Sequence, residues 1–480
     1  MFALIPASRR TLLISSTAAI LAACATPPDL GAAPQLSAPE QYETIQSFAA
    51  PVSAWPSDRW WESYGDSQLN ALIVEALADS PSLQAAAARL RRAQADAQQT
   101  DAARYPSING EAGIDNSRRD LSADNLPDAI RDSVPDDWST QASAGISLSY
   151  QLDFFGRNRA AFAAATSNAQ AAEAEAAAAR LQLSTAVALA YAEFVRLNAD
   201  RVALEEAARL RQESVALVRE RVRAGLENEG QAHQSRAELA SARADLIAVH
   251  AAIARTRNQI AALLGKGPDR GLTIELPRTL TIAGPGLPSR VDLDLIGRRP
   301  DLVASRLRAE AAAERINVAR ADFYPNVNLT AIVGLQTLGL SSLGDGTLSF
   351  AQVGPAVSLP IFSAGRIEGA YRGARADYDE AVATYNGSLA TALQEVADAI
   401  GDRRSLQAQL VEQGEGLRAA EASYRVARLR YEGGLASYID TLSVESSLID
   451  QRRAYAELEA RAFQLDITLI RALGGGYAAT

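Results

Sequence analysis

The feature that most constrains the fold of this chain is an internal duplication. The stretch from Pro81 to Pro106 recurs as Pro300 to Pro325, 219 positions later, and both stretches end in Tyr-Pro. Gly225 recurs as Gly434 at a spacing of 209, and further pairs share that spacing: Gly156 with Gly365, and Leu264 with Leu473. A repeated unit of this length predicts two related halves. The change of spacing places a ten-residue insertion between positions 106 and 156 of the first copy.

Each copy predicts one shorter helix and one long helical hairpin. Ala85 to Arg104 and Val303 to Asp322 are rich in alanine and arginine, and the Tyr-Pro pairs end these helices. No proline occurs from Gly156 to Gly225 or from Gly365 to Gly434. At 1.5 Å per residue, each of these helices could extend roughly 100 Å. Helical pattern then resumes to Leu264 and Leu473, so the two glycines predict tight hairpin tips.

Between these helices the hydrophobic period changes to two, which is typical of strands. The alternating apolar residues of the first copy are Ile146, Leu148, Tyr150, Leu152 and Phe154; those of the second are Val327, Leu329, Ala331, Val333 and Leu335, followed by Val357, Leu359 and Ile361. This alternation fits a strand with lipid on one face and water on the other. An ordinary half-buried sheet has the same pattern, so both interpretations stay open at this point.

Composition excludes several classes of function. Lysine and arginine number 47 against 57 acidic residues, and a net charge of −10 argues against a nucleic-acid partner. One Cys excludes an internal disulfide and a Cys-based zinc site. The two histidines, His233 and His250, lack a ligand pattern, and the run Gly474 to Gly476 lacks the context of a phosphate loop. The chain is therefore predicted to be no enzyme and to need no cofactor or metal.

The amino terminus has the features of a secretion signal. Arg9 and Arg10 precede a short apolar stretch that ends in Leu-Ala-Ala-Cys24, which is typical of a bacterial lipoprotein signal. We expect residues 1–23 to be removed, Cys24 to carry covalent lipid, and residues 24–58 to form an extended, Pro- and Ala-rich tether. A plain signal peptide is the alternative for Cys24, and a twin-arginine signal remains an alternative to the general secretory one. Ala25, in place of Asp, points to the outer membrane.

These observations together predict a mainly α protein with a membrane β-barrel. Residues 59–280 would form the first structural repeat and 281–480 the second, each with a helix, a β-hairpin and a long helical hairpin. Two hairpins supply four strands, which cannot close a barrel. Eight strands enclose a filled interior, whereas a trimer with twelve leaves room for water. The long hairpins would form a second, α-helical barrel in the periplasm.

Several ordered motifs then resemble those of the TolC-like outer-membrane efflux channels, lipoprotein branch (OprM-like and NodT-like). The motifs run in the expected order over nearly the whole mature chain: Trp60-Trp61 with Gly65-Asp66, Tyr150 to Arg157, Arg298 to Asp301 with Phe323 to Pro325, Pro360 to Arg366, Arg430 to Gly434, and Ala472 to Gly476. Arg306 and Asn317 depart from the family pattern, which often has Glu and Gly there.

The resemblance implies a passive outer-membrane duct of a tripartite efflux system of a Gram-negative bacterium. The implied partners are a homotrimer, outer-membrane lipid, a periplasmic adaptor and an inner-membrane transporter of the RND type. Tip residues that would contact the adaptor are Gly225, Leu226, Gly434, Leu435 and Ser437. Simple hairpin turns with no contact role are the alternative.

Gate residues are harder to transfer from the family. Its tip latch uses an Asp, a Tyr and an Arg, and the corresponding positions here are Gln231, Tyr431 and Ala436. Tyr431 is therefore retained as a gate candidate without its partners. Asp440 is a second candidate, as a charged ring in a trimer, and helix capping or pairing with an arginine is the alternative. Two other functions remain open: a lipid-anchored periplasmic coiled-coil interaction protein, and a duct for secreted proteins.

Overall fold

The computed structural model describes residues 26–118, 138–277, 281–282, 286–338 and 347–478. The predicted signal peptide and Cys24 therefore lie outside the described residues. The chain divides into two compact units, each described by itself below. The sheet unit comprises residues 1–35, 91–170 and 307–383, and the hairpin unit comprises residues 36–90, 171–306 and 384–480.

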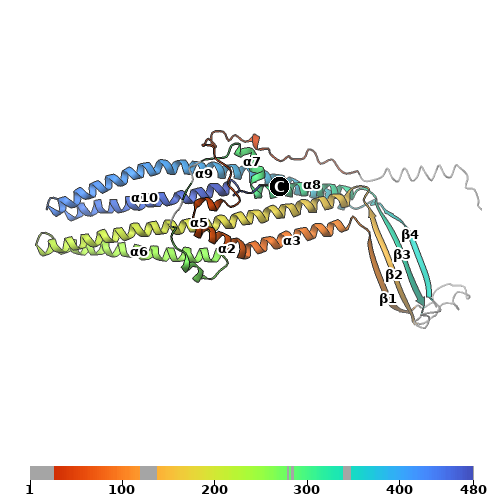
Figure 1. Ribbon diagram of the computed structural model, residues 1–480. Helices are drawn as coiled ribbons and strands as arrows, with labels where there is room; N and C mark the ends of the chain where they lie inside the picture. Colours follow the sequence, from red (N-terminus) through yellow and green to blue (C-terminus); the bar gives the residue numbers. More distant parts are fainter. Residues whose placement is uncertain (1–25, 119–137, 278–280, 283–285, 339–346, 479–480) are drawn as a thin grey trace, which may run out of the picture. The chain divides into compact units, whose positions relative to one another are not determined.

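The two copies have the same order of elements (Figure 1). The first copy contains η2 (Trp60–Tyr64), α2 (Ser67–Asp79), α3 (Pro81–Ala102), β1 (Ser107–Arg118), β2 (Trp138–Leu152), α5 (Arg157–Arg223), α6 (Glu229–Leu263) and η3 (Pro268–Thr273). The second contains α7 (Val291–Arg298), α8 (Pro300–Ala321), β3 (Asn326–Leu338), β4 (Thr347–Ser358), α9 (Arg366–Glu432) and α10 (Tyr438–Ala472); η1 (Pro39–Gln41) precedes both. Corresponding helices have equal lengths, with 67 residues in α5 and α9 and 35 in α6 and α10.

Among the described residues, no helix is both long enough and apolar enough to cross a membrane.

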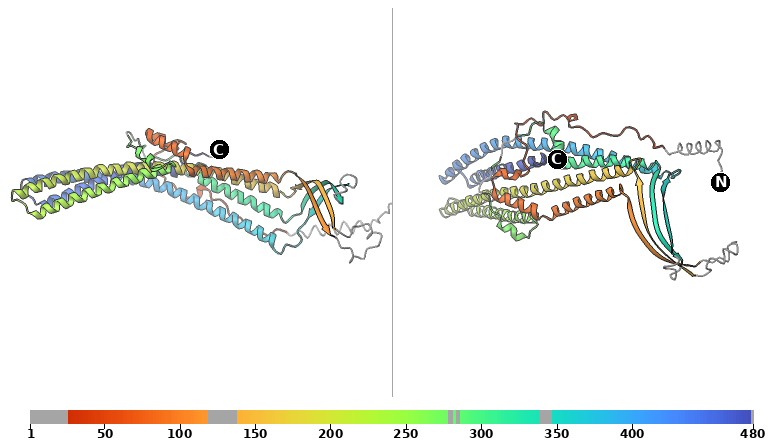
Figure 2. Two further views of the ribbon diagram at one scale, coloured as in Figure 1. Left: turned by 90° about the horizontal axis from the view of Figure 1, so that it is seen from below. Right: turned by 45° about the vertical axis from the view of Figure 1, so that its right-hand side comes forward.

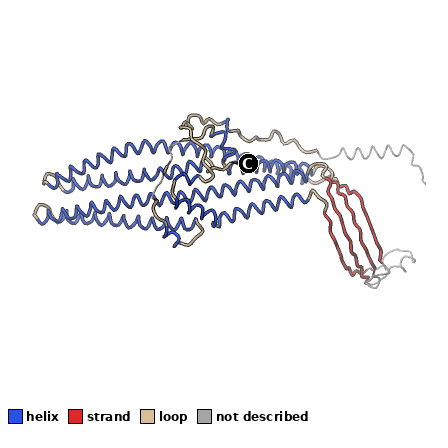
Figure 3. The backbone as a smooth tube through the Cα atoms, viewed as in Figure 1, coloured by secondary structure: helices blue, strands red, loops and turns tan. Residues whose placement is uncertain are grey.

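The sheet unit is built around one antiparallel sheet in the order β1-β2-β3-β4 (Figure 3). The two hairpins join where β2 pairs with β3, with Ile146 opposite Val333 and Leu148 opposite Ala331. Because neighbours in register share a face, these four side chains lie together, and they line an exposed apolar hollow with Ile108 and Val353. The other face carries polar residues such as Ser149, whose hydroxyl accepts a hydrogen bond from Asn328 at 3.1 Å. Among the described residues, β1 and β4 each pair on one side only.

Two strands end earlier than their alternation predicts. The pattern runs to Phe154, but β2 ends at Leu152 because Asp153 turns the chain into α5 and accepts hydrogen bonds from the first backbone N–H groups of that helix. The pattern of the last strand runs to Ile361, but β4 ends at Ser358, and Pro360 has no N–H to continue the ladder. Alternation does not locate the first strand of the predicted first hairpin, β1, because Gly, Asp and Asn interrupt its apolar positions.

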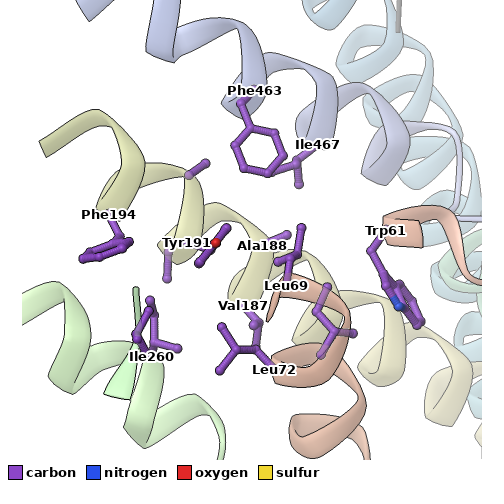
Figure 4. Close-up of a cluster of buried hydrophobic side chains, with 14 of the residues drawn as sticks. Trp61, Leu69, Leu72, Val187, Ala188, Tyr191, Phe194, Ile260, Phe463 and Ile467 are labelled. Atoms are coloured by element: carbon purple, nitrogen blue, oxygen red, sulfur yellow. The ribbon is translucent and has the colours of Figure 1, made fainter. Parts of the chain in front are cut away.

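The hairpin unit has two main hydrophobic cores, and α10 contributes side chains to both. The first packs α2 and η2 against α5, α6 and α10 around Tyr191 and Phe463, as Figure 4 shows. Trp61, Leu69 and Ile260 are among its buried members, each at most 2% exposed. The second core joins α7, α9 and α10 and includes Leu295, Leu389 and Leu469. Smaller clusters of buried side chains lie nearer the tips, around Tyr431 with Tyr438 and around Tyr424 with Leu448.

The predicted tether is extended but packed. Leu36, Tyr42, Phe48 and Trp55 lie against the second core. Backbone contacts add to this packing: Ser53 N–H donates to Leu287 O at 2.8 Å. Nothing in the Pro- and Ala-rich composition indicated this, because docking depends on the surface that the other helices form.

Candidate functional site

The two tips of the helical hairpins have the same backbone geometry (Figure 2). Gly225 follows α5 at the first tip with φ of 73°, and Gly434 follows α9 at the second tip with φ of 74°. The next residue in each tip donates back over the helix end: Leu226 N–H to Arg221 O at 2.8 Å, and Leu435 N–H to Arg430 O at 2.7 Å. A glycine in the left-handed region with this bond is the Schellman ending of an α-helix. Both predicted tip positions therefore lie at true hairpin turns.

The residues that begin the returning helices form capping boxes of different charge. Asn228 caps α6 and exchanges hydrogen bonds with Gln231. Ser437 caps α10 in the same way with Asp440, whose carboxylate accepts the Ser437 hydroxyl at 2.7 Å. These hydrogen bonds lower the pKa of the Asp440 carboxyl. In this structure Asp440 caps the start of α10. A ring of three Asp440 carboxylates in a trimer stays a prediction.

Tyr431 does not project from its tip but is buried beneath it, 1% exposed. The Arg221 guanidinium lies 4.5 Å from the centre of its ring and donates to the Tyr431 carbonyl at 2.8 Å. Glu227, in the first tip, lies 3.7 Å from the same guanidinium. Burial raises the pKa of the Tyr431 hydroxyl, so the residue stays neutral. Arg221 and Glu227 are the partners that sequence reasoning missed.

A small cavity lies between the helices below this contact. Its volume is about 80 Å³, and it is lined by α5, α9 and α10 through residues that include Ser214, Tyr424, Tyr438 and Thr441. Burial raises the pKa of Tyr438 to about 12. Glu445, 1% exposed, accepts the Ser214 hydroxyl at 2.6 Å. The interior near the tips is therefore polar in part, in contrast with the apolar cores.

Glu445 belongs to a buried ion pair that joins the two copies. Its carboxylate lies 3.0 Å from Arg211 of α5, whose side chain is 7% exposed. Arg211 also donates to Ser446 at 2.8 Å. Burial raises the pKa of Glu445, and Ser214 and Arg211 act in the opposite direction. Removing Arg211 would leave the Glu445 carboxylate buried without its ion-pair partner, whereas Arg211 also lies 3.7 Å from Glu238.

Polar contacts continue along the seam between α5 and α10. Moving away from the tips, Arg452 lies 3.3 Å from Glu206, Arg453 2.9 Å from Asp200, and Gln464 3.1 Å from Glu193. Residue numbers fall on α10 as they rise on α5, so these helices are antiparallel neighbours. Most pairs on this seam are partly exposed to solvent, and Arg211 with Glu445 is the buried one.

The tips themselves carry exposed apolar side chains and no catalytic arrangement. Leu226 is 63% exposed and Leu435 73% exposed. Within the part of the chain that the structure describes, no group of three His, Cys, Asp or Glu side chains could hold a metal ion. The two exposed leucines offer apolar contact surface at the ends of the hairpins.

Comparison with known proteins identifies the family. The model of the outer membrane efflux protein family matches residues 72–266 and 294–475. The chain belongs to the outer membrane efflux protein family. The two matched segments fall in the two copies of the duplicated chain, and the family places this protein among outer-membrane efflux channels and outside the enzymes.

Relatives and solved structures agree over almost the whole length. Multidrug resistance outer membrane protein MdtP of Shigella flexneri is 30% identical over 484 residues, covering 98% of this chain and 97% of its own. Cation efflux system protein CusC of Escherichia coli strain K12 is 29% identical over 97% of this chain and 99% of its own. The crystal structure of the outer membrane protein VceC of Vibrio cholerae aligns with a TM-score of 0.82 and 43% identity, over 88% of this chain and 100% of that one.

These findings confirm the predicted family, fold class and efflux function, and the prediction that the chain is not an enzyme. The roles assigned to Cys24, to the tip residues and to the gate candidates remain predictions.

Proposed function

We propose that this protein is the outer-membrane duct of a tripartite efflux system and that three copies build one channel. The observation that carries this proposal is the sheet, which has one exposed apolar face and two edge strands that, in the described part of the chain, pair on one side only. Edge strands with unpaired backbone groups bind further strands. Pairing β4 of one copy with β1 of the next would use both edges and continue the apolar face.

The number of copies follows from the size of the interior. Four strands cannot close, eight leave an interior that side chains fill, and twelve leave an aqueous lumen. With the apolar face outward, residues such as Ser149 and Asn328 would line that lumen. Three copies are the smallest number that gives an open path.

The helical hairpins would carry this path into the periplasm and meet an adaptor there. Exposed Leu226 and Leu435 at the two tips support an apolar contact, and the neighbouring Gly225, Gly434 and Ser437 fix the shape of the turns. The adaptor would link the duct to an inner-membrane transporter of the RND type. Tyr431 and Asp440 remain the gate candidates on the second tip.

We also propose that the mature protein begins at Cys24 with covalent lipid and is anchored in the outer membrane. The support is the sequence of the amino end. We propose that the cargo is a small molecule and that selection occurs in the inner-membrane transporter; relatives of this chain are named for multidrug resistance and for cation efflux.

Conductance in planar bilayers tests the channel, with the mass of the same sample measured in detergent. We expect a trimer that conducts, if only in brief openings. A silent trimer would be tested again with Tyr431→Ala and Asp440→Asn, which should open a sealed tip. A monomer that never conducts would contradict the proposal and favour the lipid-anchored interaction protein.

Efflux in cells tests the adaptor contact. Leu226→Asp with Leu435→Asp should abolish resistance in a strain that depends on this pump, while purified protein conducts as before. Leu272→Asp is the matched control, because Leu272 is 69% exposed and lies on η3 away from both tips. Equal resistance in both variants would argue against tip docking.

A further inference from the structure

The residues that follow the proposed lipidation site are held by the sheet unit. The carboxylate of Asp29 accepts the Gly31 N–H at 2.9 Å, and Gly31 has φ of 72°. This Asx turn bends the chain at a position where glycine is favoured. The carbonyls of Gly31 and Ala32 are thereby presented to the same side chain of α9.

That side chain is Arg375, near the start of α9. Its guanidinium donates to Ala32 O at 2.6 Å and to Gly31 O at 3.3 Å. Asp379, one turn along the helix, fixes the guanidinium at 2.7 Å, and the Arg375 side chain is only 13% exposed. An arginine that is packed and held by a carboxylate loses little further freedom when it binds carbonyls.

Tyr378 adds a second contact on the same helix face. It lies three residues after Arg375, and positions three apart are neighbours on a helix. Its hydroxyl donates to Pro34 O at 3.2 Å. Two side chains of α9 therefore bind the carbonyls of Gly31, Ala32 and Pro34, all within the sheet unit.

We propose that Arg375 and Tyr378 form a clasp that fixes how far the lipid anchor can reach from the sheet. The proposal rests on the acylation of Cys24 proposed above. Seven residues separate Cys24 from Gly31, and at about 3.5 Å per residue the anchor stays within about 25 Å of the clasp. Without the clasp, the next residue of the segment with an interaction of its own is Gln35. Gln35 lies 11 positions after Cys24, which would allow a reach of about 39 Å.

The clasp lies close to the level at which the strands end. Arg375 is nine residues from Arg366, the first residue of α9, which corresponds to about 14 Å along the helix. Exposed aromatic residues gather at the chain segments that join strands to helices: Phe154 is 66% exposed, Phe362 is 89% exposed, and Phe155 stacks on Tyr324 at 4.8 Å. Aromatic residues at strand ends are typical of the boundary between lipid and water. The acyl chains and the sheet would thus enter one leaflet side by side, as two attachments of fixed spacing.

Nitroxide mobility at position 33 tests the clasp. Cys24→Ser removes the natural thiol, and Ala33→Cys supplies a single labelling site at an exposed position between clasped residues. We expect a restricted spectrum that becomes mobile with Arg375→Ala plus Tyr378→Phe. Arg372→Ala is the control, because Arg372 is 63% exposed and pairs only along its own helix with Glu368. A mobile label in the parent, or no change in the clasp variant, would overturn the proposal.

Shortening the segment tests the reach of the anchor in the acylated protein. Deleting Thr26 to Pro28 removes about 10 Å of reach. We expect several-fold less assembled oligomer in the outer membrane, restored when the clasp is also removed. An ineffective deletion, a defect that the clasp variant does not restore, or an amino-terminal peptide whose mass shows no lipid would each contradict the clasp as a determinant of reach.

These outcomes are separable from the channel itself. The purified clasp variant should conduct like the parent, because neither Arg375 nor Tyr378 belongs to the tips. Failure of the parent to conduct would defeat the proposed channel while leaving the nitroxide result intact.

Discussion

The two hairpin tips share a backbone and an exposed leucine but differ in the side chains that are buried beneath the tip and that cap the returning helix. Gly225 and Gly434 have φ of 73° and 74°, and both tips close with the same hydrogen bond. At equivalent positions of the two copies, 209 residues apart, Val222 corresponds to Tyr431 and Gln231 to Asp440. Duplication thus preserved the turn, which local geometry dictates, while contacts that depend on the other copy diverged.

The seam between the copies shows the same divergence. Glu445 corresponds to Arg236 in the first copy, and Arg211 corresponds to Ala420 in the second. The buried pair of Arg211 and Glu445 therefore joins positions that are not equivalent in the repeat. The corresponding positions, Ala420 and Arg236, cannot form an ion pair. A duplicated chain that packs against itself needs different residues on the two sides of one interface.

The largest effect is expected from breaking the buried pair. Arg211→Ala would leave the Glu445 carboxylate buried and unpaired, which costs about 3–5 kcal/mol. Hydrogen exchange of α10 should report this loss as a lower free energy of local opening. Arg453→Ala is the control, since its side chain is 42% exposed and its pair with Asp200 should be worth less than about 1 kcal/mol. Similar losses in both variants would show that burial does not distinguish the pairs.

Tyr431→Ala should have the next largest effect. The change empties a site that is 1% exposed and removes the contact with Arg221, at a cost of about 3–4 kcal/mol. Val222→Ala, at the equivalent and only partly buried position, should cost about 1 kcal/mol. Exchange rates of the tip amides give both values. If the two substitutions cost the same, the tips are less different than their packing indicates.

Alanine at the two tip glycines should give equal and smaller losses. No atom lies within 4 Å of a Cβ added at Gly225 or Gly434, so only the backbone conformation opposes the change. The left-handed region costs a residue with a side chain about 1–2 kcal/mol. The exchange of the last amides of α5 and α9 should therefore increase to the same extent. A clear inequality would mean that one tip is strained or supported by contacts beyond the turn.

Acidification should weaken the capping box of the second tip, which contains a carboxylate, and not that of the first. Hydrogen bonds from Ser437 lower the folded-state pKa of Asp440 below its ordinary value of 3.8. A lowered carboxyl pKa stabilises the fold above the unfolded value, and this contribution is lost as the pH falls through the folded pKa. Amides of the first turn of α10 should therefore exchange faster below about pH 4, after correction for the intrinsic rate. Those of α6, capped by Asn228 and Gln231, should not change, and Asp440→Asn should abolish the difference.

The sequence by itself determined the parts that local chemistry controls. The lengths of α5 and α9 follow from long proline-free stretches that end at glycine, and the central strands follow from alternation around Ile146 and Val333. The family was predicted from motifs that occur in the expected order along the chain, and the family model confirms it. The ends of β2 and β4 were misplaced because capping by Asp153 and the missing N–H of Pro360 act within one or two residues of the apolar pattern.

Tertiary structure alone decided which side chains of the long helices meet. Tyr431 and Glu445 are buried because helices from the other copy cover them, and no pattern on α9 or α10 encodes that cover. The docking of the segment around Ala32 on Arg375 is likewise a contact between positions more than 340 residues apart. Propensity and alternation are short-range properties of a chain, whereas burial and pairing depend on what folding brings next to it.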